Sequence, residues 1–199
     1  MSGSAIGVVS LGRVPALFPR VIAAHIEGFL ALSAEILEPT ELPDACLDAR
    51  RMQYDAGKLI AHLAEPAQTT DNPSDRPSTD FTKIIGLLAE DLFLPIFTHV
   101  FGEAEQGGRH AVVSLYRLQY RSDGRPAPES QVYERAAKVA LHETGHLFNL
   151  FHCTDACCLM HFADDLDTLD AIPINFCPYC TRFINDACRR AGLVKEKYF

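Results

Sequence analysis

The sequence predicts an α/β (α+β) fold, in which strands and helices alternate before a small zinc-stabilised subdomain at the carboxyl end. Short apolar runs of strand length alternate with longer segments of helical periodicity as far as residue 150. The last third of the chain holds closely spaced histidines and cysteines, the side chains that bind zinc. We therefore expect one subdomain over residues 1–152, ending in a long helix, and a second over residues 153–199.

The composition is that of a globular protein with its own core. The chain has 199 residues, of which 48% are apolar and 22% charged, and its net charge is −8. Nucleic-acid phosphates require clustered Lys and Arg, so no nucleic-acid partner is expected. The chain contains no run of about 18 apolar residues, so no membrane span is predicted. The start of the chain has no basic leader, and an odd count of 7 cysteines favours a reducing compartment. We therefore expect a cytoplasmic protein. We also expect it to be a monomer.

Four elements are predicted in the first third of the chain. Residues 6–11 form a short apolar run typical of a buried strand, and residues 15–30 have helical periodicity. Residues 34–37 indicate a second strand. Residues 47–63 are predicted to form another helix, and its apolar stripe, which includes Met52, is assigned to the core.

The middle of the chain begins with a break in the apolar pattern. Residues 66–80 hold 3 prolines and almost nothing apolar, which predicts a surface loop or a linker. Residues 83–92 indicate a strand, and residues 100–103 and 111–118 indicate two more strands that are joined by a glycine turn. A long helix is then predicted over residues 131–150.

The most informative residues lie near the end of this last helix, in the run HETGHLFNLFHC. His142 and His146 are one helical turn apart and therefore share a face, where they can bind the same ion. Glu143 lies beside the first ligand, where it can take a proton from a metal-bound water. His152 is too far along to share that face, so the chain must turn back after about residue 148. Three neutral imidazoles leave one position of a tetrahedral zinc open, which is the arrangement of a catalytic site.

The alternative to a metal site is an HExxH sequence that occurs by chance inside an ordinary amphipathic helix. The third histidine at the elongated spacing argues against chance. Met160, which follows it, does the same, because the long form of this motif is paired with a methionine turn. Together these residues favour a zinc hydrolase site.

A second cluster follows at once, with the spacing C-x4-C-x18-C-x2-C at Cys153, Cys158, Cys177 and Cys180. Two close pairs separated by a loop are the usual layout of a four-cysteine zinc site. Four thiolates fill the tetrahedron and leave no place for water or substrate, so this metal would be structural. Buried free thiols or a disulfide pair are the alternatives, and Cys157 competes with its neighbour as a ligand.

The segment HETGHLFNLFHCTDACCLM, together with CPYC, resembles the signature of the archaemetzincins, a metzincin-clan family of zinc peptidases. The resemblance implies a twisted, mostly parallel sheet above the active-site helix. One antiparallel edge strand would lie along the cleft, and residues 100–104 or their neighbour would supply it. It also implies a peptide or protein substrate, Glu143 as general base and Met160 as a methionine turn beneath the metal. The zinc ligands that it implies are His142, His146 and His152 for a catalytic ion, and Cys153, Cys158, Cys177 and Cys180 for a structural one.

One position departs from that signature. Where the family has a glycine between the second and third histidines, this chain has Asn149. The glycine lets the helix end in a left-handed conformation, so that the chain can double back. Asn is the non-glycine residue that best tolerates this conformation, so we expect the turn to be kept at some conformational cost.

The sequence is compatible with three functions. The first is a zinc metallopeptidase, the second a zinc-stabilised peptide-binding protein without productive turnover, and the third a hydrolase of a non-peptide amide. Glu143 favours an enzyme, because a binding protein needs no base. His161 directly follows Met160 and is expected to pack or to contact substrate. The acidic residues at 164–170 indicate a solvated loop, with a preference for basic substrates as the second interpretation.

Overall fold

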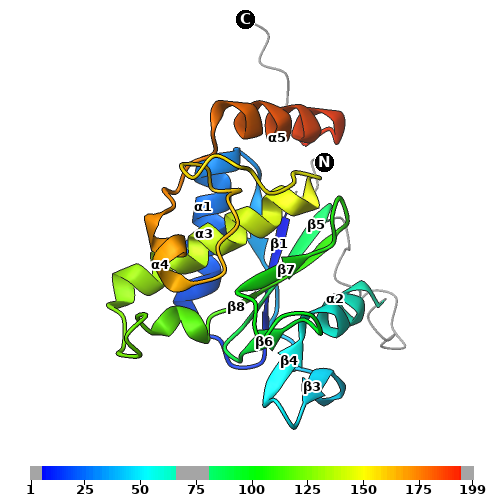
Figure 1. The fold of residues 1–199 in the computed structure, drawn as a ribbon. Coiled ribbons are helices and arrows are strands. Elements are labelled where there is room, and N and C mark those ends of the chain that lie inside the picture. Colours follow the sequence, from blue (N-terminus) through cyan, green and yellow to red (C-terminus); the bar gives the residue numbers. More distant parts are fainter. Residues whose placement is uncertain (1–5, 66–80, 194–199) are drawn as a thin grey trace, which may run out of the picture.

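A five-stranded mixed sheet forms the centre of the molecule, with the strand order β2-β1-β5-β8-β7 (Figure 1). The structure is a computed structural model that describes residues 6–65 and 81–193. The four strands β2, β1, β5 and β8 run parallel to one another, and β7 pairs antiparallel with β8 at the edge. These strands are β1 (Ile6–Leu11), β2 (Ala34–Ile36), β5 (Lys83–Leu88), β7 (Gly102–Ala104) and β8 (His110–Ser114).

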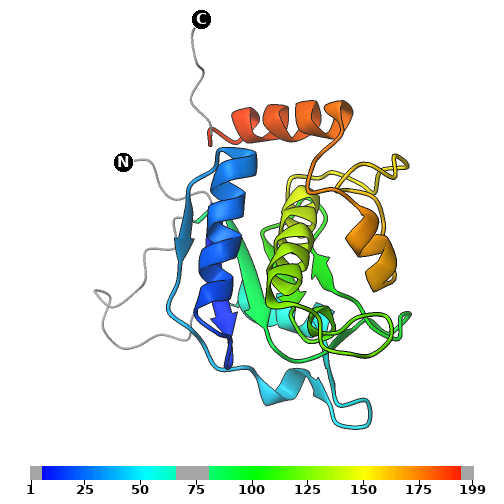
Figure 2. The same cartoon turned by 90° about the vertical axis from the view of Figure 1, so that its left-hand side faces the viewer.

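Helices cover both faces of the sheet. On one face, α1 (Leu17–Leu30) and α3 (Glu129–Leu147) lie side by side and share the larger apolar core with the sheet (Figure 2). On the other face, α2 (Ala56–Ala64) packs with alternate residues of the same strands in a second, smaller core. This alternation follows from the pleat, which sends successive side chains to opposite faces. The predicted α/β fold with a twisted mixed sheet is confirmed.

The predicted helix over residues 47–63 is wrong in its first half. That stretch forms β3 (Leu47–Asp48) and β4 (Gln53–Asp55), and the helix α2 begins at Ala56. The Asp48 carboxylate accepts hydrogen bonds from the backbone N–H groups of Arg50 and Arg51 and stabilises a turn there. Met52 has a left-handed φ of 54° and is 73% exposed, so it is not a core residue as predicted.

Two predicted strands are shorter than expected. The strand expected over residues 83–92 ends at Leu88, and a separate short strand, β6 (Leu92–Phe93), pairs with β4 in a three-stranded sheet of β3, β4 and β6. The strand expected over residues 111–118 ends at Ser114 and is followed by a 3-10 turn, η3 (Arg117–Gln119). A partly buried ion pair fixes this region, because Arg117 donates two hydrogen bonds to the buried Asp91. Apolar runs alone do not reveal such breaks.

The carboxyl end of the chain packs onto the larger core. It contains α4 (Leu166–Ala171) and α5 (Pro178–Arg190), and α5 begins with proline in its first turn, where no backbone N–H is needed. Ile184 and Cys188 of α5 belong to the same buried cluster as strand β1. The division at residue 152 therefore remains a prediction. The predicted loop over residues 66–80 lies outside the described residues. In the described part of the chain, no helix is both long and apolar enough to cross a membrane.

Candidate metal centres

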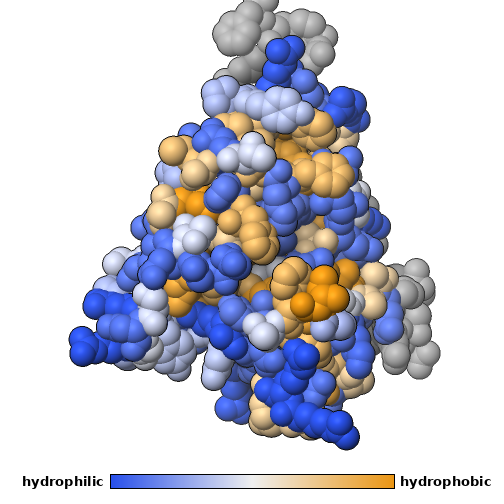
Figure 3. All heavy atoms as spheres, viewed as in Figure 1, coloured by the Kyte–Doolittle hydropathy of each residue, from blue (hydrophilic) through white to orange (hydrophobic). Residues whose placement is uncertain are grey.

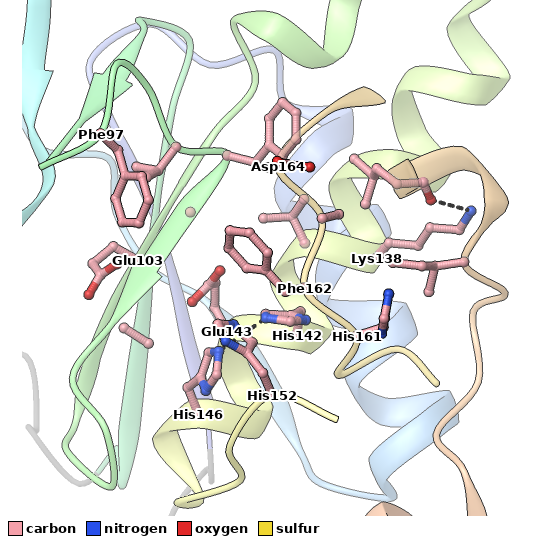
Figure 4. Close-up of a pocket in the computed structure, with 18 of the residues that line it drawn as sticks. Phe97, Glu103, Lys138, His142, Glu143, His146, His152, His161, Phe162 and Asp164 are labelled. Carbon is pink, nitrogen blue, oxygen red and sulfur yellow. Dashed lines mark hydrogen bonds between the residues drawn. The ribbon is translucent and has the colours of Figure 1, made fainter. Parts of the chain in front are cut away.

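Three histidine side chains converge at the carboxyl end of α3 (Figure 4). His142 and His146 come from the last two turns of the helix, and His152 comes from the segment that follows it. One ring nitrogen from each of the three lies within 4.8 Å of the others, and the Nε2 atoms of His142 and His146 are 3.0 Å apart. The structure therefore brings together the three residues that the sequence predicted as ligands of one ion.

The turn after α3 directs His152 back toward the helix. The helix ends at Leu147, and Asn149 adopts a left-handed φ of 67°, as predicted. The N–H of Leu150 donates to the carbonyl of Gly145, which is the long hydrogen bond of a helix that ends in a left-handed residue. The Nε2 amide of Gln106 donates to Oδ1 of Asn149 at 3.3 Å and ties the turn to the segment after β7.

Hydrogen bonds fix the tautomers of the first two histidines. Nδ1 of His142 donates to the carbonyl of Leu159 at 2.7 Å, and Nδ1 of His146 donates to the carbonyl of Leu150 at 2.8 Å. Each neutral ring then carries its proton on Nδ1, so both Nε2 atoms present lone pairs to each other. A cation between them satisfies both lone pairs, and backbone carbonyls that hold the opposite ring nitrogen are typical of metal-binding histidines. These residues fit a zinc ion.

Burial keeps the three rings neutral. It lowers the pKa of His142 to about 3, with the neighbouring His146 adding to the effect, and it also lowers the pKa of His146 and His152. A neutral imidazole is the form that binds a metal. The ligand set is therefore available throughout the physiological pH range.

Glu143 lies beside the histidines and is almost fully buried. Its side chain is directed into the space between β7 and the three histidine rings (Figure 4). Burial raises its pKa well above the ordinary value, and the nearby Glu103 raises it further. Gly102 of β7 makes room for this side chain, because a β-carbon at that position would lie 2.8 Å from Oε1 of Glu143. Sequence reasoning missed both Gly102 and Glu103, although a glycine in a short strand is a signal of close approach.

The segment after His152 supports the histidines from below. Met160 is fully buried, and its sulfur lies against Gly145 of α3. The carbonyl of Met160 accepts from the N–H of Cys153 at 2.7 Å, and the carbonyl of the preceding Leu159 holds His142. This contact with the helix that carries two of the histidines is compatible with the expected methionine turn, which remains a prediction.

The four predicted cysteines form a second cluster on the other side of this segment. The sulfur atoms of Cys153, Cys158, Cys177 and Cys180 all lie within 4.8 Å of one another, and none is in a disulfide. The sulfurs of Cys153 and Cys177 are 3.9 Å apart, far beyond a disulfide bond. Backbone N–H groups of Cys177 and Cys180 point at sulfur atoms of the cluster, as they do when thiolates accept hydrogen bonds. Cys157 is exposed and stands outside the group.

A cleft of about 550 Å³ opens over the histidines. One wall is β7 with the segment before it, the floor is α3, and the other wall is the segment after Met160 (Figure 4). Phe97 and Phe162 stand on opposite walls and are 44% and 46% exposed. His161 lines the cleft as well, and its Nδ1 donates to the carbonyl of Cys153. In the space-filling view, apolar side chains gather in the middle of this face, beside β7 (Figure 3). The geometry suits an extended chain that lies along β7.

Comparison with protein families yields a match that spans most of the chain. The family model described as peptidase family M54 matches residues 26–186. Among curated proteins, an archaemetzincin of Haloquadratum walsbyi is 31% identical over 182 residues, which cover 90% of this chain and 98% of that protein. An archaemetzincin of Methanopyrus kandleri is 32% identical over 184 residues, which cover 91% and 95%.

Solved structures show the same similarity. The crystal structure of archaemetzincin from Methanopyrus kandleri superposes with a TM-score of 0.77 at 30% identity, and the match covers 95% of this chain and 97% of that chain. The structure of archaemetzincin from Archaeoglobus fulgidus, complexed with malonate, gives a TM-score of 0.74 at 26% identity, with 90% and 99% covered.

Proposed function

Because this chain belongs to peptidase family M54, the family of the archaemetzincins, and is a zinc metallopeptidase, we propose that it cleaves peptide bonds with Glu143 as general base. His142, His146 and His152 hold the catalytic zinc. The observation that carries the proposal is the pair of unprotonated Nε2 atoms, 3.0 Å apart, beside a buried carboxyl group in an open cleft. This arrangement supports a cation and a base that act together on a bound peptide.

The chain positions both the substrate and the proton. A zinc ion held by the three histidines supplies Lewis-acid polarisation of the peptide carbonyl and of the attacking water. The outer edge of β7 offers backbone N–H and C=O groups to an extended peptide, which fixes the scissile bond over α3. Glu143 takes a proton from the attacking water and passes it to the leaving amine.

The four cysteines hold a second, structural zinc. Their cluster ties the start of α5 to the segment that carries His152, Leu159 and Met160. Those three residues complete the histidine site from outside the helix, so the cysteine site acts on catalysis through the position of this segment. We infer two zinc ions per chain. We also infer that the protein acts as a cytoplasmic monomer. A nucleic-acid partner is not expected, because a net charge of −8 disfavours binding to phosphates.

The decisive experiment is the substitution Glu143→Gln, which keeps the shape of the side chain and removes the base. We expect the zinc content, measured by elemental mass spectrometry, to stay at the level of the parent protein. Cleavage of a mixed peptide library should fall by about 10²–10⁴-fold, the usual contribution of general acid–base catalysis. Glu41→Gln is a matched control, because Glu41 is exposed and does not line the cleft.

Two results contradict the proposal. Equal cleavage by the parent and by Glu143→Gln shows that another group moves the proton. A zinc-loaded parent that binds peptides in the cleft and cleaves none of them indicates a peptide-binding protein without turnover.

A further inference from the structure

Glu103 is a half-buried carboxyl group at the rim of the cleft, and it takes no part in the proposed proton transfer. It lies in the middle of the edge strand β7 and is included in the lining of the cleft. Among the described residues, no side chain or backbone group forms a hydrogen bond or an ion pair with its carboxyl. Burial without a compensating donor raises the pKa of Glu103. A partly buried carboxylate that lacks a partner is costly to keep, unless a ligand supplies the partner.

The register of β7 places Glu103 on a defined face. Gly102 faces Glu143 and α3, so its neighbour Glu103 is directed to the opposite face of the strand. Glu103 pairs with Val112 of β8, whose side chain belongs to the core under α2. Figure 4 shows the carboxyl of Glu103 on the β7 side of the cleft, turned away from Glu143. The exposed ring of Phe97 is drawn on the same side of the cleft as Glu103 (Figure 4).

Carboxyl groups outnumber cationic Lys and Arg side chains among the described residues that line the cleft. Its lining includes the carboxyl groups of Glu103, Glu143 and Asp164, and Lys138 is the one Lys or Arg among the described lining residues. The ammonium group of Lys138 is fully occupied: it lies 2.8 Å from Glu134 and donates to the carbonyls of Leu169 and Asp170. Only the aliphatic stem of Lys138 therefore faces the cleft, and no protein cation neutralises Glu103.

We propose that Glu103 is a specificity-determining residue that binds a positively charged group of the peptide substrate. An extended peptide at the edge of β7 alternates its side chains between the α3 face and the α2 face. Residues directed toward α3 enter the space over the histidines, and their neighbours on the other face meet Glu103. This inference rests on the proposed function, because it takes the bound strand to be the substrate.

Two groups in a peptide have the required charge, a Lys or Arg side chain and a free amino terminus. Either can donate charge-assisted hydrogen bonds to the carboxylate. The ring of Phe97 offers an apolar and aromatic surface on the same wall, which suits the stem of a long basic side chain or its cation. Asp164 is exposed on the opposite wall, where solvent screens its charge, so its contribution is smaller.

The first test measures cleavage of octapeptide libraries by the zinc-loaded full-length protein, with Lys, Arg, Gln or Glu fixed at each position in turn. One library is acetylated at the amino terminus and the other is free. We expect kcat/KM to be about tenfold higher for Lys or Arg than for Gln at one position near the cleaved bond. If the gain in kcat/KM appears only in the library with a free amino terminus, and only at the position next to that terminus, the site is assigned to the terminal amine.

The second test uses substitutions that separate charge from structure. Glu103→Gln should abolish the preference, and Glu103→Lys should reverse it in favour of Glu-containing peptides, which a merely structural role of Glu103 would not do. Asp164→Asn should reduce the preference by less than about threefold, as expected for an exposed charge. Glu41→Gln removes one exposed charge away from the cleft and should leave the preference unchanged.

A binding measurement keeps this inference separate from the proposed function. Fluorescein-labelled Lys and Gln octapeptides are titrated into zinc-loaded Glu143→Gln protein, with and without Glu103→Gln, and anisotropy is recorded. Tighter binding of the Lys peptide that disappears with Glu103→Gln supports the inference even when the parent cleaves nothing. Equal binding of both peptides, or a Lys preference that survives Glu103→Gln, overturns it even when the parent is an active peptidase.

Discussion

The sulfur of Met160 lies so close to Gly145 that a β-carbon at residue 145 would overlap it. Met160 comes from the segment that the cysteine cluster holds, and Gly145 lies next to His146 on the helix. The two candidate metal centres are thus connected through a contact that only glycine allows. Protein cores are close-packed, so a methyl group added at residue 145 must displace Met160 or the helix.

Gly145→Ala should therefore destabilise the protein and disturb the histidine site. We expect a loss of about 1–3 kcal/mol in the free energy of unfolding, typical of overpacking, and weaker binding of zinc at the histidine site. Gly28→Ala in α1 is the matched control, because a β-carbon there meets nothing within 4 Å. Alanine should stabilise that helix slightly. Denaturant titration and zinc competition with a chelator check both variants. Equal behaviour of the two would show that Met160 moves aside freely.

Substitutions at Asn149 test the turn that delivers His152. Asn149→Gly should keep zinc affinity and activity, because glycine enters the left-handed conformation freely. Asn149→Val should weaken zinc binding at the histidine site, because a β-branched residue resists a positive φ. Zinc affinity is measured by chelator competition. If the valine and glycine variants bind zinc equally well, the left-handed turn does not control the third ligand.

The cysteine cluster is tested by metal content. Purified parent protein should hold about two zinc ions per chain, as expected for two tetrahedral sites. Cys158→Ser and Cys177→Ser should each lose the structural ion and lower the melting temperature, because a structural zinc contributes directly to folding. Cys157→Ser should keep both ions, since Cys157 is exposed and outside the cluster. A parent that never exceeds one zinc after reconstitution would remove the cysteine site.

The buried ion pair between Arg135 and Asp170 predicts a defined pH dependence. Arg135 is 1% exposed and donates two hydrogen bonds to the Asp170 carboxylate, which lower the pKa of Asp170. A carboxyl group whose pKa is lower in the folded state stabilises the fold above its unfolded pKa of about 3.9. That contribution is lost as the pH falls through the folded pKa.

Asp170→Asn should accordingly destabilise the protein at pH 7 by about 3–5 kcal/mol, because a buried guanidinium loses its counter-charge. The difference from the parent should shrink as the pH falls below about 4. Asp123→Asn is the control, because its partner Arg125 is exposed and such pairs contribute about 0–1 kcal/mol. Urea titrations over this pH range measure both differences. A difference for Asp170→Asn that is independent of pH would contradict the ion-pair account.

The parts of the molecule that local patterns govern were predictable from the sequence. The strand at residues 6–11 is a single apolar run, and the spacing of His142 and His146 is a property of any helix. Met52 shows where such patterns fail. Its apolar side chain fits a helical stripe, but the Asp48 turn and the cap at Asp55 start the helix later.

Other features depend on contacts between distant segments, and no local pattern carries them. The carbonyl of Leu159 fixes the tautomer of His142 across 17 positions of sequence. Glu103 lies at the rim of the cleft because β7 is the edge strand of the sheet. Strand order is set by the packing of the whole domain, so neither residue could be assigned a role beforehand.

The exposed edge of β7 also has a consequence for self-association. A strand that leaves its backbone groups open to a substrate leaves them equally open to another molecule of the same protein, which is the first step of aggregation. Here the open edge extends over only Gly102–Ala104, and the glutamate at its centre is repeated in every copy. Two such edges that approach each other therefore gain few hydrogen bonds and bring like charges together. The same short, acidic edge that admits a cationic peptide thus discourages the enzyme from pairing with itself.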